Sequence, residues 1–446
     1  MLNKYKIISK AVRHFSSALY ITGDKAMTNF VVLTPVIDFE KQIEHKENLI
    51  ENIKARQLPI DINAVEEQWN FFQDIEHKKK ALEQTRTGIS QRMSYLIKQE
   101  NDFPSSKELD KLKLHLKIVK DDLKHLRTMR YSVEEAAALQ VLNLPNVLHP
   151  KTPENEELEV YRYLEINDSK TENHLTLGNQ KGYFKFLNNF SCYLTSDAAL
   201  FERSLQNYFN GELVKLNYLQ FSNSDLVKSV VVEGCGGNPF AGSDVLTLED
   251  IHCVNKEGLN RLHLVGGSSF YSFMAYFTKH FLQPTHFPIK AFCVGRKYQT
   301  VDPSSIQNLF NLNQSSEIGL FRATNNSEVF EHVLEDLLSL YKPLGYHFRV
   351  ALLPANKLNI AESLRISIQM FSNHLQTYIE VGYVSFYEDF ISKRLLLNWN
   401  QNGVRKFSYL TGGSLVNIHK VIGCVVENNS LDSKPLINAF LSKYVF

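Results

Sequence analysis

The sequence lacks the features that would assign it to a disulfide-rich, zinc-binding or membrane protein. None of its five cysteines forms a C-x-x-C pair, which argues against a zinc ribbon and a disulfide framework. No apolar run reaches the roughly 20 residues that a membrane span requires, so we expect a soluble protein with no membrane partner. The 49 basic residues are balanced by 48 acidic ones, so a nucleic-acid surface must come from local clustering of charge.

Acidic residues are missing from the first 23 positions, which instead contain serines and four basic residues, Lys4, Lys6, Lys10 and Arg13. A basic, serine-containing, acid-poor leader is typical of a mitochondrial transit peptide. We therefore assign residues 1–25 to such a peptide, exclude them from the fold, and expect the protein in the mitochondrial matrix. The alternative is a ragged N-terminus of a cytosolic protein.

Glycine is almost absent between residues 38 and 140, where apolar residues instead recur at alternating intervals of three and four. This spacing predicts two coiled-coil helices, and Pro104 in the intervening segment 101–106 ends one helix before the next begins. Two such helices joined by a short breaker form an antiparallel hairpin, so we expect a helical arm over residues 26–145. The first seam is Phe72, Ile75, Leu82, Ile89, Met93 and Leu96, and the second is Leu109, Leu112, Leu116, Val119, Leu123 and Leu126.

Basic residues occupy many of the expected exposed positions of this arm near its turn. Their excess favours contact with nucleic-acid phosphates, although a charged helix is often only a solvated face. The candidate nucleic-acid-binding residues are Lys78, Lys79, Lys80, Arg86, Arg92, Lys98, Lys117, Lys120, Lys124, Arg127 and Arg130.

Residues 146–446 follow a proline-containing linker and have a mixed pattern of apolar segments. With 43% hydrophobic residues in 446, the chain can bury a large core. Four segments predict strands and two predict helices, which together favour an antiparallel sheet with helices packed against it. The predicted strands are KSVVVEG (228–234), RLHLVGG (261–267), FRVALLP (348–354) and IEVGYVSF (379–386), and the predicted helices are LEDLLSLYK (334–342) and VIGCVVEN (421–428).

A series of motifs in this half resembles the seryl-tRNA synthetases, which are class II aminoacyl-tRNA synthetases. The helical hairpin is followed by an L-P-N-x-x-H-P hinge, and the remaining motifs come in the family's order. We therefore expect an α+β fold: an N-terminal antiparallel coiled-coil arm and a class II synthetase-like antiparallel sheet with flanking helices. The motifs are LPNVLHP (144–150), HLTLG (174–178), EGCGGNPF (233–240), FPIK (287–290), IEVGYVSFYEDFISKR (379–394) and TGGSLVNIHKVIGCVVEN (411–428).

The ATP side of the pocket that this resemblance implies is strongly altered. Synthesis of an aminoacyl adenylate needs cations at the α-phosphate, which the family supplies from C-[FY]-R-x-E. The chain has CVGRKYQT there, with Arg296 or Lys297 as the remaining cation and Gln299 in place of the glutamate. The family's G-L-x-R-x-H-x-F-x-K-x-E, which carries the ring on which adenine stacks, becomes NLFNLNQSSEIG. Its changed positions are Asn311, Asn313, Ser315, Glu317 and Gly319.

The amino-acid side is altered as well. The family's T-x-E, which grips serine, becomes Gly267-Ser268-Ser269, and Arg365 stands where an acidic residue belongs in Y-D-L-E. A guanidinium cannot replace the carboxylate that holds the ammonium of serine without repulsion. Serine should therefore bind poorly or not at all.

Three positions on the phosphate side still resemble the family: Lys297, Glu380 at the metal-binding position, and Lys420 at the motif 3 arginine. Gly382 and Tyr383 replace the serines beside Glu380. One retained carboxylate does not make a magnesium site, so we expect no metal and no cofactor.

These substitutions predict a pseudoenzyme, and the chain resembles a class of insect seryl-tRNA synthetase-like mitochondrial proteins. In motif 1, Asn223 and Ser224 stand where the family has proline, so the subunit interface is expected to have changed partner. The expected partners are tRNA or another nucleic acid, and either the active mitochondrial seryl-tRNA synthetase in a heterodimer or a second copy in a homodimer. Such a protein would support mitochondrial translation or genome maintenance. The alternatives are a divergent but active mitochondrial seryl-tRNA synthetase and a structural protein whose arm binds nothing.

Overall fold

A computed structural model describes most of the chain as two compact units. The first unit contains the described residues 17–22, 37–39, 59–99 and 106–144, and the second contains the described residues 33–36, 40–58 and those from 145 onward. Parts of the predicted leader, of the breaker between the helices and of the motif at 233–240 lie outside the described residues. The structure describes residues 17–22, 33–99, 106–166, 169–239, 245–248, 261–302 and 304–428.

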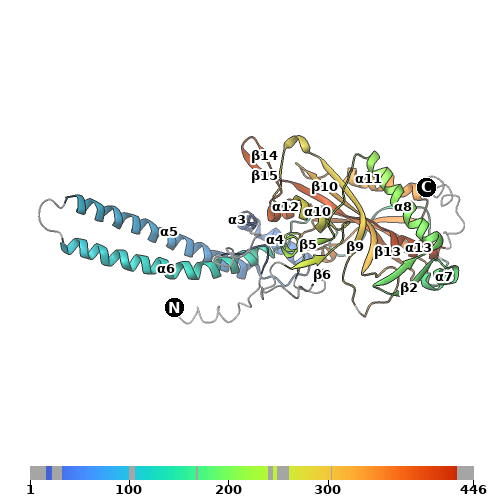
Figure 1. Ribbon diagram of the computed structural model, residues 1–446, viewed down its shortest axis with the longest axis horizontal. Coiled ribbons are helices and arrows are strands. Elements are labelled where there is room, and N and C mark those ends of the chain that lie inside the picture. The colour runs from blue at the N-terminus through green and yellow to red at the C-terminus, as the bar shows by residue number, and fades with distance from the viewer. Residues whose placement is uncertain are drawn as a thin grey trace. The chain divides into compact units, whose positions relative to one another are not determined.

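The first unit contains two long helices, α5 (Ile62–Gln99) and α6 (Ser106–Leu142), which lie side by side and antiparallel (Figure 1). The predicted seams face the partner helix, since Ile75, Leu96 and Val119 are among the few buried residues of the pair. The apolar repeat of three and four residues therefore turns one stripe of each helix toward the other. The predicted helical hairpin is confirmed.

Ion pairs and aromatic contacts strengthen the end of the hairpin far from its turn. Arg130 of α6 contacts Glu76 of α5 and lies 3.3 Å from Glu134 one turn later. The Trp69 ring lies 5.4 Å from that of Phe39. Arg130 was predicted as an exposed phosphate contact, and the structure corrects this, because its side chain is only 22% exposed and binds two carboxylates.

Residues 17–22 belong to the folded first unit, although the sequence placed them in a leader outside the fold. Ala18, Leu19 and Ile21 are buried. Tyr20 donates a hydrogen bond from its hydroxyl to Glu134 at 3.0 Å, and Thr22 donates one to the carbonyl oxygen of Tyr131 in α6. Burial and the carboxylate of Glu134 raise the pKa of Tyr20. The exclusion of these six residues from the fold is therefore wrong; whether residues before them are a transit peptide stays a prediction.

The second unit is built on an eight-stranded sheet with the order β1-β11-β12-β13-β16-β10-β9-β4. Every neighbouring pair is antiparallel except β4 and β9, which are parallel. The strands in this order are β1 (Leu158–Tyr163), β11 (Phe348–Leu352), β12 (Leu364–Ser372), β13 (Thr377–Glu388), β16 (Tyr409–Asn417), β10 (Gln314–Thr324), β9 (Ile289–Tyr298) and β4 (Leu219–Gln220).

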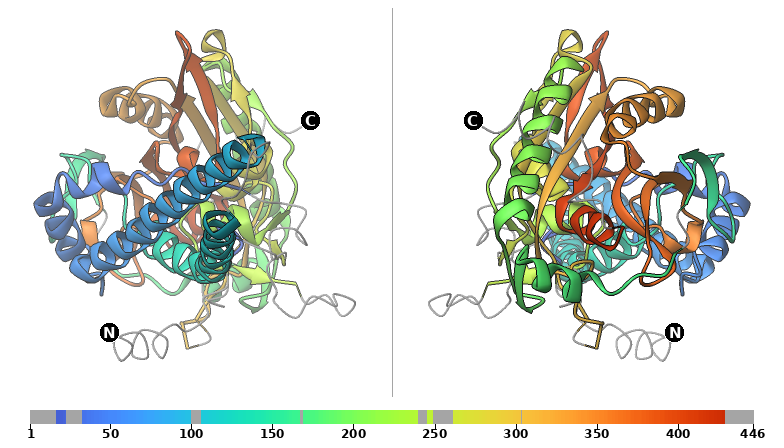
Figure 2. Two further views of the ribbon diagram at one scale, coloured as in Figure 1. Left: turned by 90° about the vertical axis from the view of Figure 1, so that its left-hand side faces the viewer. Right: turned by 90° about the vertical axis from the view of Figure 1, so that its right-hand side faces the viewer.

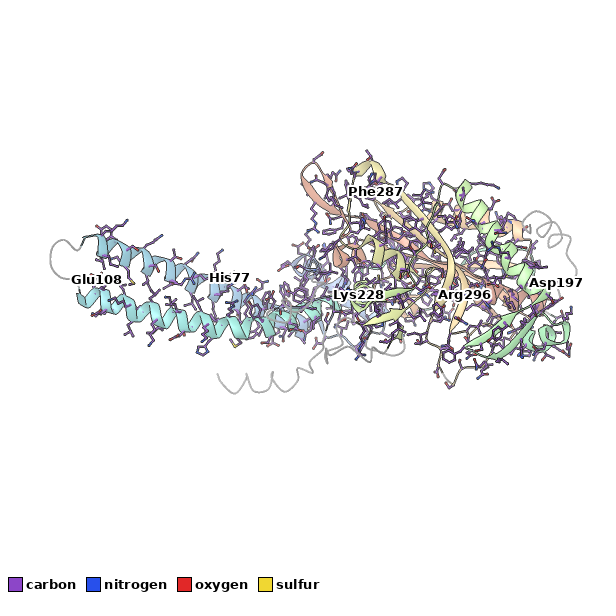
Figure 3. The ribbon with its side chains drawn as sticks, viewed as in Figure 1. His77, Glu108, Asp197, Lys228, Phe287 and Arg296 are labelled. Atoms are coloured by element: carbon purple, nitrogen blue, oxygen red, sulfur yellow. The ribbon has the colours of Figure 1, made fainter. Side chains whose placement is uncertain are left out.

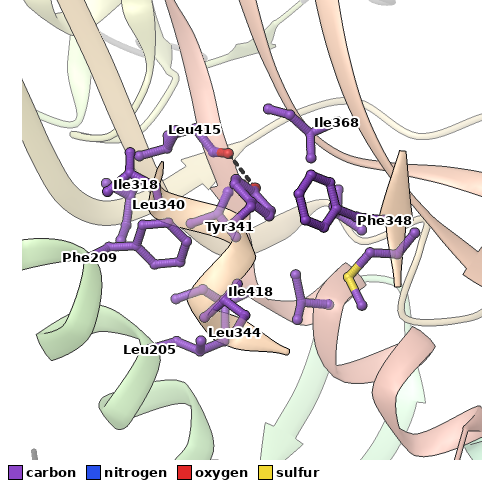
Figure 4. Close-up of a cluster of buried hydrophobic side chains, with 14 of the residues drawn as sticks. Leu205, Phe209, Ile318, Leu340, Tyr341, Leu344, Phe348, Ile368, Leu415 and Ile418 are labelled. Atoms are coloured by element: carbon purple, nitrogen blue, oxygen red, sulfur yellow. Dashed lines mark hydrogen bonds between the residues drawn. The ribbon is translucent and has the colours of Figure 1, made fainter. Parts of the chain in front are cut away.

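Helices cover one face of this sheet with apolar side chains. The helices α7 (His174–Lys181), α8 (Ser196–Lys215), α11 (Phe330–Tyr341) and α13 (Ile418–Glu427) share one hydrophobic core with the strands. In Figure 2, α8 and α13 lie in front of the strands in the right-hand view. Figure 4 shows Phe209 of α8 beside Tyr341 of α11, whose hydroxyl donates to the carbonyl oxygen of Leu415 at 2.7 Å.

The remaining elements are short. The helices are α3 (Phe39–Ile43), α4 (Lys46–Ala55), α9 (Ser229–Gly234), α10 (Phe270–Phe277) and α12 (Phe390–Leu395), with 3₁₀ turns at Pro284–His286, Lys342–Leu344 and Ala355–Lys357. Three small sheets pair β2 (Phe184–Asn188) with β3 (Ser191–Leu194), β7 (Leu262–Leu264) with β5 (Leu226–Lys228) and β6 (Leu246–Thr247), and β14 (Asn398–Gln401) with β15 (Val404–Phe407) and β8 (Phe281–Leu282).

Most of the predicted elements of this unit are confirmed, with one clear error. FRVALLP and IEVGYVSF are strands, LEDLLSLYK and VIGCVVEN are mainly helical, and RLHLVGG is a strand only at its centre. KSVVVEG was predicted as a strand but forms α9. Val230, Val231 and Val232 are all buried, so they lack the alternation of buried and exposed side chains found in a half-buried strand. Their packing overrides the β propensity of valine.

The burial of residues 17–22 predicts that two N-terminal truncations will differ in stability. A chain starting at Ser17 keeps the contacts with α6, whereas a chain starting at Gly23 loses the apolar burial of Leu19 and Ile21. We expect the shorter chain to lose about 2–4 kcal/mol of unfolding free energy. Urea and thermal denaturation of the two chains would measure this, with Tyr20→Phe as a milder variant. Identical transitions would show that this segment does not pack in solution.

Candidate functional site

Strand alternation gathers the predicted pocket residues on the sheet face opposite the apolar core. In β10, Ile318 and Leu320 point to the core, so Glu317 and Gly319 point to the other face. A cavity of about 100 Å³ lies on this face. Four predicted residues line it, Ser269, Lys297, Arg365 and Tyr383, together with Cys235, Ser268, Phe270, Tyr271, Asn359, Glu362, Tyr387 and Ser414.

The Arg365 side chain is held by a buried carboxylate that the sequence did not single out. Its Nε and Nη2 atoms both donate to Oε1 of Glu362, at 3.1 and 2.7 Å. Glu362 is only 2% exposed, and it also accepts from the Ser385 hydroxyl and the Asn359 backbone N–H. Burial alone would lower the pKa of Arg365, but the carboxylates of Glu362 and Glu380 outweigh it and raise that pKa. The positive charge of Arg365, which was expected to repel the ammonium of serine, is therefore neutralised by these carboxylates.

Glu380 and Tyr383 complete the surroundings of this guanidinium. Glu380 lies 3.7 Å from Arg365 and accepts a hydrogen bond from Ser367 at 2.7 Å. The Tyr383 ring centre lies 4.4 Å from the guanidinium carbon of Arg365 and 5.2 Å from Nζ of Lys297. Both cations are close enough to the ring for cation–π attraction. The carboxylate of Glu380 is thus engaged by the chain's own groups.

Lys297 forms the second ion pair of the cavity, 3.6 Å from the buried carboxylate of Glu317. Ser315 and Asn417 each donate to Glu317 at 2.7 Å, and Ser414 donates to it as well. Burial would raise the pKa of Glu317, but Lys297 and the hydroxyls lower it overall. Burial would likewise lower the pKa of Lys297, and Glu317 raises it overall. Of the two cations that the sequence left open, Lys297 lines the cavity, whereas Arg296 does not and lies 4.0 Å from Glu202.

The loop at Gly266–Ser269 fills space beside the strands. A Cβ atom at Gly319 would lie 1.9 Å from the Ser268 carbonyl oxygen, so position 319 admits no larger side chain while this loop is in place. The loop is fixed by hydrogen bonds from the Gly267 N–H to Asp225 at 2.7 Å and from the Asn223 amide to the Gly267 carbonyl at 2.9 Å. The conformation of this loop and the glycine at position 319 therefore depend on each other.

The residues predicted on the adenine side do not line this cavity. Asn313 donates to the carbonyl of Gln299 at 3.1 Å, and Gln299 donates to that of Leu312 at 3.0 Å. Asn311 donates to the carbonyl of Ile306 at 3.2 Å. These side chains hydrogen-bond to backbone carbonyls in the connection between β9 and β10. Their role here is therefore to hold that connection.

Lys420 lies in the first turn of α13, where its Nζ donates to the carbonyl oxygen of Glu380 at 3.2 Å. The neighbouring His419 accepts a hydrogen bond from the Ser316 N–H on Nδ1, and burial lowers its pKa to about 4. It is therefore neutral at pH 7. Among the described residues, no group of three or more His, Cys, Asp or Glu could hold a metal ion. No helix in that part of the chain is long and apolar enough to cross a membrane.

The comparisons with known proteins bear on this geometry. No family model matches the chain. The chain is 31% identical over 443 residues to the serine–tRNA synthetase-like protein Slimp of Drosophila melanogaster, covering 96% of this chain and 92% of that protein. The chain belongs to the seryl-tRNA synthetase family. It is also 22% identical over 437 residues to the mitochondrial serine–tRNA ligase of Mus musculus, covering 92% and 83% of the two chains.

Solved structures of the family share the fold. The Pyrococcus horikoshii seryl-tRNA synthetase complexed with ATP superposes with a TM-score of 0.76 at 14% identity, covering 88% of this chain and 94% of that one. The cytoplasmic serine–tRNA ligase of Naegleria fowleri in complex with AMP gives 0.74 at 14% identity, with 90% and 96% covered. The class II synthetase-like sheet and the helical arm expected from the sequence are therefore confirmed.

The basic residues predicted for nucleic-acid binding are spread along the hairpin rather than gathered near its turn. Figure 3 labels His77 beside this group and Glu108 at the turn end, which shows how far Lys78, Lys79 and Lys80 lie from the turn. Arg92 lies 3.3 Å from Glu108, and Lys79 lies 3.9 Å from Glu76. The predicted position near the turn is therefore wrong for the lysine triplet. The remaining candidates are exposed: they are Lys117, Lys120, Lys124 and Arg127 on α6, and Arg86 and Lys98 on α5.

Two residues that shape the pocket, Glu362 and Asp225, were not recognised from the sequence, and a third, Asn223, was singled out only for the subunit interface. Glu362 holds Arg365, while Asn223 and Asp225 fix the loop at Gly267. The spacing of Glu362 and Arg365, three residues apart with opposite charge, was the available signal. It did not distinguish a buried pair from a surface one, because burial follows from the neighbouring strands.

The Arg365–Glu362 pair predicts a specific pattern of stabilities. Arg365→Ala leaves a buried carboxylate without its cation and should cost about 3 kcal/mol. The double variant with Glu362→Gln should recover much of this loss. Urea denaturation of the single and double variants measures both effects.

Arg349→Ala is the matched control, because its side chain is equally exposed, at 20%, but pairs with the more accessible Glu157. Its cost should be about 1 kcal/mol or less. Equal losses for the two arginine variants would contradict the role given to the buried pair.

Proposed function

We propose that this chain is a non-catalytic member of the seryl-tRNA synthetase family that acts in mitochondria by binding nucleic acid and a partner subunit. The observation that carries the proposal is the Arg365 guanidinium, which is paired with Glu362 and Glu380 inside the cavity. An ammonium group of a substrate would have to displace this internal cation. Since a buried pair broken on one side costs several kcal/mol, weak contacts with serine would not suffice.

The size of the cavity supports the same proposal. Ligand pockets for molecules of drug size usually have volumes of about 300–1,000 Å³. The cavity beside Arg365 has about 100 Å³, and the Ser268 carbonyl closes the space beside Gly319. An aminoacyl adenylate would need this loop to move. Glu380 and Lys420 remain near the expected phosphate side, but they contact the chain's own groups.

The helical hairpin supports nucleic-acid binding. Its exposed lysines and arginines could neutralise phosphates, and tRNA is the first candidate because the relatives are named as tRNA ligases. The basic leader and the mitochondrial relatives support a location in the mitochondrial matrix. The partner would be the active mitochondrial seryl-tRNA synthetase, or a second copy of this chain. The proposed role is support of mitochondrial translation or genome maintenance.

A divergent but active synthetase is the second candidate. Lys297, Glu380 and Lys420 are retained in the sequence, and the mitochondrial ligases match this chain over most of their length. This candidate requires Arg365 to leave its carboxylates when serine and ATP bind. It makes the opposite prediction about amino-acid activation.

Serine-dependent exchange of pyrophosphate into ATP tests the two candidates directly. We expect the purified chain to show no exchange above that of its Lys420→Ala variant, because the cavity is closed by its own charges. When the active mitochondrial synthetase is added, this chain should still contribute no pyrophosphate exchange. If the two proteins associate, the exchange rate of the active synthetase should change. Exchange by the chain alone above the Lys420→Ala level would overturn the non-catalytic proposal.

Charge reversal on the hairpin tests nucleic-acid binding. Replacing Lys78, Lys79, Lys80 and Arg86 by glutamate should abolish retention of tRNA and reduce the salt dependence of binding by roughly 0.7–0.9 per lost phosphate contact. Reversal of Lys185 and Lys228, which are exposed in the second unit, is the control. Unchanged retention after the fourfold reversal would instead favour a structural hairpin.

A further inference from the structure

A small three-stranded sheet in the second unit is built from a part of the sequence without acidic residues. Residues 261–301 and 390–426 contain no aspartate or glutamate, although the whole chain has 48 of them. The sheet formed by β8, β14 and β15, here called the ribbon, comes entirely from these two segments (Figure 1). Their basic residues are Arg261, Lys279, Lys290, Arg296, Lys297, Lys393, Arg394, Arg405, Lys406 and Lys420.

The ribbon has a well-defined geometry. A two-residue turn at Asn402 and Gly403, both with positive φ of 52° and 84°, joins β14 to β15. Such values are those of a type I′ turn, which matches the twist of a hairpin. Asn398 of β14 lies opposite Phe407 of β15 on one side and opposite Phe281 of β8 on the other. These three residues therefore form a row across the ribbon.

This row lies on the outer face. The adjacent row contains Leu282 and Trp399, which are each only 5% exposed, so it faces inward. Figure 3 labels Phe287, whose ring lies 5.6 Å from Trp399 on that inner side. Since successive side chains alternate, Phe281 and Phe407 point outward, and Phe281 is 59% exposed. A large aromatic side chain so exposed on a strand has no role in the core.

Cations accompany these rings. The guanidinium carbon of Arg405 lies 5.1 Å above the Phe407 ring, and Arg405 and Lys406 are both exposed. Within the described part of the chain, neither makes an ion pair. Lys393, by contrast, pairs with Asp389 at 2.8 Å, and Lys290 lies 3.9 Å from Asp336. The positive charge of the ribbon is thus not cancelled by the protein.

An exposed ring at Phe281, a half-buried ring at Phe407 and the cation of Arg405 on the same face fit a single-stranded nucleic acid. Phe281 and Phe407 lie two strand spacings apart, about 10 Å, so each ring can receive one base. Bases in a duplex are stacked on each other and cannot offer free faces, whereas unstacked bases of a single strand stack on aromatic rings and arginine planes. Arg405, two residues from Phe407 on the same face, would meet the phosphates. Lys406, by contrast, lies opposite Trp399 and points to the other face.

We propose that the outer face of the ribbon binds single-stranded RNA or DNA, with bases stacked on Phe281 and Phe407 and phosphates at Arg405. This site is separate from the cavity at Arg365 and from the basic residues of the hairpin. The ribbon is proposed to bind nucleic acid independently of the helical hairpin. The proposal for the ribbon and the proposal for the helical hairpin can therefore fail separately.

Fluorescence anisotropy with the full chain tests the ribbon. The probes are a labelled RNA of about 12 unstructured nucleotides, the same sequence as DNA, and a duplex of equal length. Phe281→Ala should weaken binding of the single strand by about fivefold or more and leave the duplex unchanged. Phe281→Tyr should retain binding, because it keeps the ring. The RNA and DNA probes show which sugar the face accepts.

Phe190→Ala is the matched control, because Phe190 is 63% exposed between β2 and β3, away from the ribbon. Replacing Arg405 by glutamine should lower the salt slope for the single strand by about 0.7. Thermal unfolding should be unchanged in all variants, since the substituted side chains are exposed.

Three outcomes would overturn the proposal. Equal affinity of Phe281→Ala and the unchanged chain would remove the stacking role. An equal loss of affinity for the single strand and for the duplex would indicate that binding depends on charge alone and not on stacking. If Phe281→Ala weakened capture of the active mitochondrial synthetase but not of nucleic acid, the face would be a protein interface.

Discussion

The pairing of Arg365 with Glu362 is the constraint on which the pocket depends. A buried guanidinium and carboxylate need further hydrogen bonds to offset their desolvation. The Asn359 backbone N–H and the Ser385 hydroxyl supply them to Glu362. Arg56, at the end of α4, donates to the carbonyl oxygens of Asn359 and Glu362 at 2.9 and 2.6 Å, which fixes the loop that carries Glu362. Burial lowers the pKa of Arg56 to about 10, so this residue also keeps its charge at pH 7. The position of one carboxylate thus rests on contacts from a helix some 300 residues earlier in the chain.

Changes that look independent in the sequence are coupled through space. The loop at Gly267 and the glycine at 319 accommodate each other, since a side chain at 319 would collide with the Ser268 carbonyl. In the same way, Lys297 of the cavity lining and the buried Glu317 neutralise each other. Restoring the family's glutamate at position 319 would therefore introduce a clash, and restoring its lysine at position 317 would place two cations side by side. Loss of a substrate pocket by this route is difficult to reverse one substitution at a time.

The sequence predicted the large features because they depend on long patterns. The seams of the hairpin repeat over many turns, and the motif order indicated the class II sheet before any contact was known. The errors fall where tertiary contacts decide. Three consecutive valines form α9 because all of them are buried, and Leu19 and Ile21 pack despite a basic, acid-poor leader sequence around them. The partner of Arg365 could not be predicted, because identifying it required the register between strands and the position of the loop at Asn359.

The matches to the family that remain in the sequence are largely structural. His174 lies 2.6 Å from the buried carboxylate of Glu427, and its other ring nitrogen accepts the Leu309 N–H, which ties α7 to α13 and to the β9–β10 connection. Gly178 leaves room for the Phe184 ring, which a Cβ atom would approach at 2.1 Å. Asn146 of the L-P-N hinge binds two backbone carbonyls. These residues satisfy buried polar groups or close packing, so folding requires them whether or not a substrate binds. A motif match can therefore preserve the scaffold of a synthetase without indicating its activity.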